Sequence, residues 1–136
     1  MSTIFAPERQ LVYEWYTPSL EKSIAFLQAF GFMVLRREAA FAELSYGRNR
    51  LLVEQMQEDY NSEEDSAAVG YRGYHGNLRI LVDNVDAVYQ SAMLINGCRV
   101  LKELGDRYYG LRDFTVGGPY GLALRFAQPL PGFTED

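Results

Sequence analysis

The residue types best suited to catalysis are scarce in this sequence. His75 and Cys98 are its only histidine and its only cysteine. A nucleophilic cysteine or serine needs a base close by, and a catalytic metal usually needs three or more protein ligands, so neither chemistry has a full set of residues here. His75 lies between Gly73 and Gly76 at the start of an expected strand, which favours a solvated or hydrogen-bonded ring over a metal ligand. We predict that Cys98 is a buried, inert thiol.

Aromatic side chains are abundant and indicate a different kind of chemistry. Ten tyrosines, eight phenylalanines and one tryptophan make up 14% of the chain. Aromatic faces bind flat or cationic small molecules by stacking and by cation–π contacts. They also fill cores and dimer interfaces, and this alternative stays open for each residue. The tyrosines expected in loops are Tyr60, Tyr71, Tyr74, Tyr108, Tyr109 and Tyr120.

Acidic residues are concentrated in one window. The chain has 13 Lys and Arg against 18 Asp and Glu, a net charge of −5, which argues against a nucleic-acid-binding protein. From Leu51 to Tyr71 there are six acidic residues and no basic one. A solvated linker explains such a run, and a rim that attracts a cationic ligand is the alternative.

Length and composition bound the class of protein. The chain has 136 residues and is 48% hydrophobic, which suits a single globular domain, residues 1–136. The longest mainly apolar run, Ile24 to Leu35, is too short to cross a bilayer, and we expect no membrane interaction. No secretory signal is visible and a lone cysteine forms no internal disulfide, so we expect a cytoplasmic protein.

The elements that must position these residues occur twice. The first half reads as a strand at 11–17, a helix capped by Ser19 and stopped by Gly31, and short strands at 32–37, 41–46 and 50–56. The second half repeats this order, with a strand at 78–82, a helix between Asn84 and Gly97, and strands at 99–103, 111–116 and 122–127. The expected breaks between these last strands are at Gly105-Asp106 and at residues 117–121.

Two βαβββ modules, at about 8–56 and 75–130, are therefore predicted, with an acidic linker at about 57–74. One helix covers only one face of each sheet. We therefore predict an α+β fold in which two curved mixed sheets surround a shared cleft.

Three segments carry a family resemblance. SLEKSIAFLQAFGF, NLRILVDNVDAVY and YGLRDFTVGGPYGLALRFAQPL resemble the glyoxalase/bleomycin resistance/dioxygenase superfamily, the vicinal oxygen chelate fold, over nearly the whole chain. The similarity is greatest to the metal-free bleomycin-resistance-like subgroup, which implies a homodimer with a ligand groove. One departure is the turn Gly118-Pro119-Tyr120-Gly121, where the family usually has Asp-Pro-Asp-Gly and its acidic capping.

The resemblance also locates the metal positions of the superfamily's enzymes. They correspond to Val12, Glu54, Asn77 and Arg125, and only Glu54 is a good ligand, because valine has no lone pair and arginine carries a fixed positive charge. His75 precedes Asn77 by two residues and would share its strand face. Because the sequence has no second histidine, it does not favour a metal site there. We predict no metal and no other cofactor.

If Val12 and Asn77 face the cleft, strand alternation decides which other side chains do so. The inward set is then Glu14, Tyr16, Leu52, Glu54, Arg79, Leu81, Ala123, Arg125 and Ala127. The set packed in the core is Tyr13, Trp15, Leu51, Val53, Leu78, Ile80, Val82, Leu122, Leu124 and Phe126.

The inward charges have two interpretations. Either they pair and neutralise one another, or they contact a polar or charged ligand. The candidate ligand-binding residues are Glu14, Tyr16, Glu54, Arg79, Tyr109 and Arg125.

The sequence thus predicts a small-molecule-binding protein that sequesters a cationic, aromatic, antibiotic-like ligand in a cleft at the module or dimer interface. The main alternative is a metal-dependent enzyme of the same superfamily, of the glyoxalase or dioxygenase type. A second alternative is an assembly surface on which Glu54 and Arg125 are structural.

Overall fold

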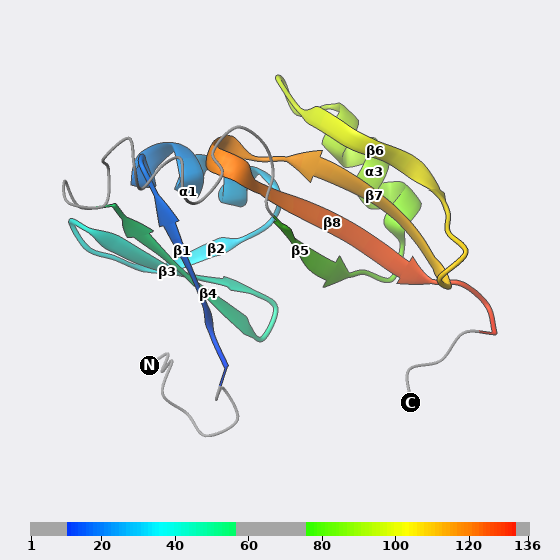
Figure 1. Cartoon of the computed structure of the whole chain (residues 1–136), viewed down its shortest axis with the longest axis horizontal. Helices are drawn as coiled ribbons and strands as arrows, with labels where there is room; N and C mark the ends of the chain where they lie inside the picture. Colours follow the sequence, from blue (N-terminus) through cyan, green and yellow to red (C-terminus); the bar gives the residue numbers. More distant parts are fainter. Residues whose placement is uncertain (1–10, 57–75, 133–136) are drawn as a thin grey trace. The chain divides into compact units, whose positions relative to one another are not determined.

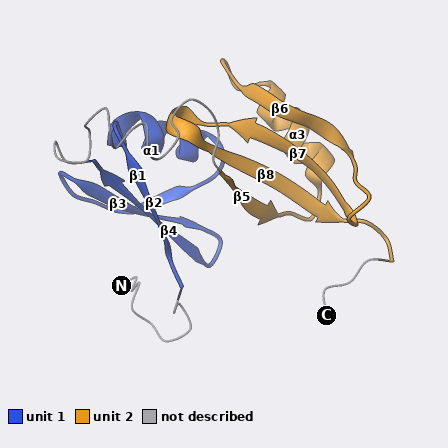
Figure 2. Ribbon diagram, in the orientation of Figure 1, with its two compact units in different colours: residues 1–68 blue, residues 69–136 orange. Residues whose placement is uncertain are grey.

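The computed structural model describes residues 11–56 and 76–132 (Figure 1). The chain divides into two compact units, residues 1–68 and 69–136 (Figure 2). Each unit holds a four-stranded mixed sheet and a helix in the order βαβββ, which confirms the predicted α+β class and the duplicated modules. The shared cleft and the single domain stay predictions, and His75 and the acidic linker lie outside the described residues.

The sheet of unit 1 has the strand order β1-β4-β3-β2, in which β1 and β4 are parallel and the other pairs antiparallel. Its elements are β1 (Tyr13–Thr17), α1 (Leu20–Ala29), β2 (Met33–Arg37), β3 (Phe41–Tyr46) and β4 (Asn49–Gln55). Each lies within two residues of its predicted position, because apolar periodicity and turn residues specify these elements locally.

Helix α1 begins and ends as its sequence predicts. The Ser19 side chain accepts a hydrogen bond from the Lys22 amide at 3.3 Å, and Gly31 has a φ of +98°, which a side chain would oppose. The buried stripe of the helix packs on one face of the sheet. Its residues and those of the facing strands are Leu20, Ile24, Leu27, Trp15, Ala42, Leu44, Leu51 and Val53.

The sheet of unit 2 has the matching order β5-β8-β7-β6. Its elements are β5 (Gly76–Leu81), α3 (Val85–Met93), β6 (Arg99–Asp106), β7 (Leu111–Gly117), a short 3₁₀ turn η3 (Pro119–Gly121) and β8 (Leu122–Pro129). Asn84 caps α3 through the Ala87 amide at 3.1 Å, as predicted. The core lies on the helix side, where Phe114 and Phe126 stack with ring centroids 5.4 Å apart.

A glutamine near the end of the last strand ties each helix to its sheet. The Gln55 side chain accepts from the Leu20 amide and the Gln128 side chain accepts from the Val85 amide, both at 2.9 Å. These bonds satisfy donors that the first helical turn leaves unpaired. The repetition of this contact extends the duplication from the order of elements to their hydrogen bonding.

Two predictions about the strands are wrong. Gly105-Asp106 does not break a strand but lies inside β6, because register shifts after Val100 and after Lys102 let the strand continue to Asp106. Tyr13 is 44% exposed instead of packing under α1, because it is the first residue of the edge strand β1.

Candidate functional site

The open face of the unit 1 sheet, opposite α1, carries the predicted acidic residues. Strand pairing aligns Tyr16 with Glu54, and Glu54 with Phe41, so that these side chains form one row across β1, β4 and β3. The next row on the same face begins with Glu14 opposite Leu52 and continues to Glu43. The structure therefore brings Glu14, Tyr16 and Glu54 to one face, because side chains two apart on a strand share a side.

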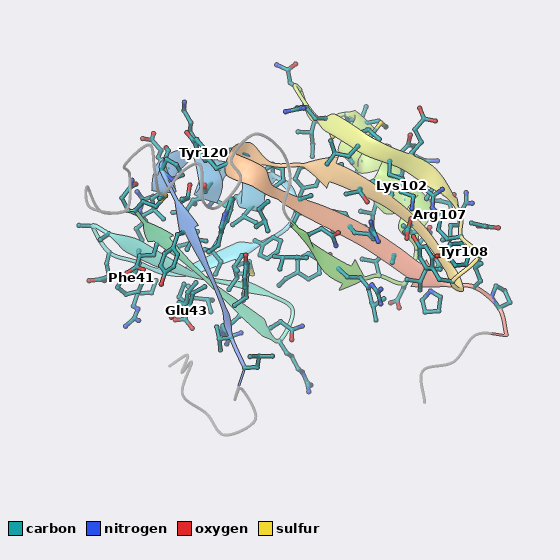
Figure 3. All side chains as sticks on the ribbon, viewed as in Figure 1. Phe41, Glu43, Lys102, Arg107, Tyr108 and Tyr120 are labelled. Atoms are coloured by element: carbon teal, nitrogen blue, oxygen red, sulfur yellow. The ribbon has the colours of Figure 1, made fainter. Side chains whose placement is uncertain are left out.

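Two arginines on this face already have partners. Arg50 lies 3.4 Å from the Glu43 carboxylate (labelled in Figure 3), and the two side chains are only 12% and 4% exposed, respectively. The Arg36 guanidinium lies 5.0 Å from the centroid of the Phe41 ring. Sequence reasoning missed both contacts. Within the described part of unit 1, neither Glu14 nor Glu54 forms an ion pair.

The open face of the unit 2 sheet is basic. Arg79 on β5 lies directly opposite Arg125 on β8, Arg125 lies opposite Thr115 on β7, and Thr115 lies opposite Lys102 on β6. The Arg125 Nε donates a hydrogen bond to Thr115 Oγ1 at 3.2 Å. Arg79 and Arg125 thus share a face, as predicted.

A buried carboxylate, Asp113, organises the far end of this face. Arg107 Nε donates to its Oδ1 at 2.8 Å, and the Tyr109 hydroxyl donates to its Oδ2 at 2.6 Å. Arg107 also donates to the Asp113 carbonyl at 3.2 Å and to the Glu103 carbonyl. Lys102 Nζ donates to the Tyr109 hydroxyl at 3.3 Å, and Figure 3 labels Lys102 and Arg107.

The charge of Asp113 is stabilised in spite of its burial. Burial alone raises the pKa of this carboxyl. The hydrogen bonds from Arg107 and Tyr109, with the charges of Arg107 and Arg125, outweigh that effect and hold its pKa below the ordinary value. Asp113 and Arg107 were missed by sequence reasoning, and Tyr109, predicted as a ligand-binding residue, has its hydroxyl engaged in this network.

The predicted pairing of the glutamates with the arginines stays a prediction. Glu14 and Glu54 belong to unit 1, whereas Arg79 and Arg125 belong to unit 2. Within each unit these candidates carry charges of the same sign, so neither unit alone supplies the pair.

The positions that correspond to metal ligands in the superfamily's enzymes do not present a metal-binding donor set. Among residues 11–56 and 76–132, no three His, Cys, Asp or Glu side chains come together. Glu54 is flanked by aromatic rings, and Arg125 faces Arg79 across the parallel strand pair. Carboxylate and imidazole groups suit a divalent cation, whereas guanidinium groups repel it. The described residues therefore do not fit the metal of those enzymes.

Cys98 follows α3 and is half-buried, less buried than predicted. Burial raises the pKa of its thiol, which lowers the thiolate fraction near neutral pH. Each helix in the described part of the chain is too short to span a membrane.

A family model described as the Glyoxalase/Bleomycin resistance protein/Dioxygenase superfamily matches residues 10–126. With two βαβββ units in the same chain, this match shows the class of protein. The chain belongs to the Glyoxalase/Bleomycin resistance protein/Dioxygenase superfamily.

Solved structures with the same fold are numerous. A glyoxalase/bleomycin resistance protein/dioxygenase from Nocardioides is 18% identical with a TM-score of 0.74, covering 92% of this chain and 85% of its own. TioX from Micromonospora sp. ML1 is 23% identical with a TM-score of 0.69, and the match covers 88% of this chain and 98% of TioX. A bleomycin-binding protein complexed with bleomycin is 16% identical with a TM-score of 0.60, and the match covers 88% of this chain and 97% of that protein. At these identities the likeness shows the fold, and no curated protein matches the sequence.

Proposed function

We propose that this protein binds a cationic, aromatic, antibiotic-like small molecule and sequesters it without breaking a bond in it. The proposal includes the absence of a metal and of any other cofactor. It is supported by membership of the superfamily and by the presence of a bleomycin-binding protein among the structures of the same fold. Glu14, Tyr16 and Glu54 are the contacts that unit 1 would contribute.

The observation that carries the proposal is the row Tyr16–Glu54–Phe41 on the open face of unit 1. Tyr16 is 49% exposed, so its ring is accessible to a flat ligand. Glu54 lies between the two aromatic residues and forms no ion pair within the described part of unit 1. A carboxylate beside an exposed aromatic ring attracts a cation by charge and by the ring quadrupole, as the Phe41 ring already attracts Arg36.

A binding titration with a bleomycin-type glycopeptide tests the proposal. We expect saturable binding at micromolar concentration, measured by calorimetry and by protein fluorescence. Glu54→Gln should weaken the affinity about tenfold or more, since a hydrogen bond to a charged group contributes about 1.5–3 kcal/mol. Glu21→Gln removes an exposed carboxylate from α1, on the other side of the sheet, and serves as the matched control.

The absence of heat and of a fluorescence change at micromolar ligand would refute the drug assignment. Elemental analysis of protein purified without chelator tests the enzymatic alternative. About one tightly bound divalent ion per chain would overturn the proposal, because the predicted ligand positions offer one carboxylate among them.

We also propose that the protein is a cytoplasmic homodimer. The edge strands β2, β5 and β6 expose Met33, Leu81 and Leu101, which are 65%, 52% and 41% accessible. A symmetric partner covers such edges and apolar side chains. Sedimentation equilibrium should give twice the chain mass, and a monomer at all concentrations would contradict this part of the proposal.

A further inference from the structure

The open face of unit 2 has an excess of positive charge that its own residues do not neutralise. Its cations are Arg79, Lys102, Arg107 and Arg125, and its buried anion is Asp113. The rest of the chain is acidic, with a net charge of −5 overall. The sheet face therefore differs in sign from the protein as a whole.

The close placement of Arg79 and Arg125 is unfavourable without an anion. The two residues lie directly opposite each other on neighbouring parallel strands, about 4.8 Å apart in a typical sheet. Like charges in this arrangement destabilise a sheet. An anion between them would turn this repulsion into attraction.

The nearby acid, Asp113, attracts Arg125 through its charge but forms no direct bond with it. Both carboxylate oxygens of Asp113 accept hydrogen bonds, one from Arg107 and the other from Tyr109. Arg125 uses its Nε to bond Thr115, which orients the guanidinium along the face. Within residues 76–132, no carboxylate forms an ion pair with Arg79 or with Arg125, and the terminal nitrogens of Arg125 make no hydrogen bond.

We propose that the row Arg79–Arg125–Thr115–Lys102 is a binding site for an anionic oxygen group of a small molecule, a phosphate or a carboxylate. Guanidinium groups bind such groups with paired N–H donors, and the Lys102 ammonium and the Thr115 hydroxyl extend the donor set across the sheet. Arg79 and Arg125 are also candidate ligand-binding residues from the sequence, and the site goes beyond the proposed function because its ligand is anionic instead of cationic.

Titration of the full chain with inorganic phosphate, followed by ¹H–¹⁵N NMR, tests this site. At constant ionic strength we expect saturable shifts of the Arg79, Thr115 and Arg125 amides. Arg125→Gln and Arg79→Gln should each weaken binding about tenfold or more. Arg79 is exposed, so its variant stays informative if Arg125→Gln fails to fold. Arg48→Gln removes an exposed arginine from the β3–β4 turn of unit 1 and should leave the affinity unchanged.

A second titration with acetate distinguishes the two ligand groups. Tighter binding of phosphate assigns a phosphate site, and equal or tighter binding of acetate assigns a carboxylate site. The proposal is overturned if neither anion gives saturable shifts, or if Arg48→Gln weakens binding as much as Arg79→Gln. It is also overturned if anions bind only to the Glu14→Gln/Glu54→Gln double variant, because the glutamates then neutralise the arginines.

Discussion

Replacing Asp113 by asparagine should strongly destabilise the protein. Asp113 is fully buried and accepts from Arg107 at 2.8 Å and from Tyr109 at 2.6 Å. Removing one partner of a buried ion pair costs about 3–5 kcal/mol. The Arg107 side chain is 20% exposed and asparagine keeps one acceptor oxygen, so we expect a smaller loss of about 2–3 kcal/mol.

Urea denaturation followed by circular dichroism measures this loss. A decrease of this size corresponds to a melting temperature lower by roughly 5–12 °C for a chain of this length. Asp106→Asn is the control, because Asp106 is 62% exposed where it pairs with Arg112 and its loss should cost under about 1 kcal/mol. A cost for Asp113→Asn no greater than that for Asp106→Asn would show that the buried ion pair does not stabilise the fold.

Four further predictions follow from the same structure. The Asp113→Asn variant tests whether the chain folds as a single domain, because Asp113 lies in unit 2 and Trp15 is buried in unit 1. If the two units unfold together, the unfolding transition seen by Trp15 fluorescence shifts as far as the one seen by circular dichroism. An unshifted fluorescence transition means that the units unfold separately. Because the pKa of Asp113 is lower in the folded protein than the unfolded value of 3.8, its carboxylate stabilises the fold at pH values above 3.8. This contribution is lost as the pH falls through the lower folded pKa. Acid titration of the wild type should therefore show a loss of unfolding free energy that Asp113→Asn lacks. Gln128→Ala removes the acceptor for the Val85 amide and should lower the unfolding free energy, measured by urea denaturation, by about 1 kcal/mol. The control Gln90→Ala, on the exposed side of α3, should lower it by under about 0.5 kcal/mol. Equal losses would contradict the capping role of Gln128. Tyr120 has a φ of +60°, a backbone conformation that glycine adopts without strain. Tyr120→Gly should therefore raise the unfolding free energy by about 0.5–1 kcal/mol. A lower melting temperature would show that the tyrosine side chain stabilises the fold by more than the backbone strain costs.

The local elements of this fold were predictable because their signals lie close together in the sequence. Ser19 and Asn84 cap helices through amides three residues ahead, and Gly31 ends α1 with a positive φ. The shared face of Glu14, Tyr16 and Glu54 was predictable for a similar reason, since strand alternation has a period of two. Tyr13 was misplaced because alternation says which side a residue takes, not whether an edge position is covered.

Contacts between distant positions were not predictable from these patterns. Gln55 and Gln128 reach helix amides 35 and 43 residues away, and no local motif marks them. The β6 strand was predicted to end before Gly105, yet it continues through two register shifts that pairing with β7 imposes.

The sequence alone determined the duplicated βαβββ order, the caps of both helices and the shared face of Glu14, Tyr16 and Glu54. Only the tertiary structure decided that Arg107 and Tyr109 enclose Asp113, and that Arg79, Arg125 and Lys102 form one row. The physical reason is that periodicity records which side of an element a residue faces. Strand pairing then chooses its neighbours, and those neighbours decide whether a charge is satisfied or left to bind a ligand.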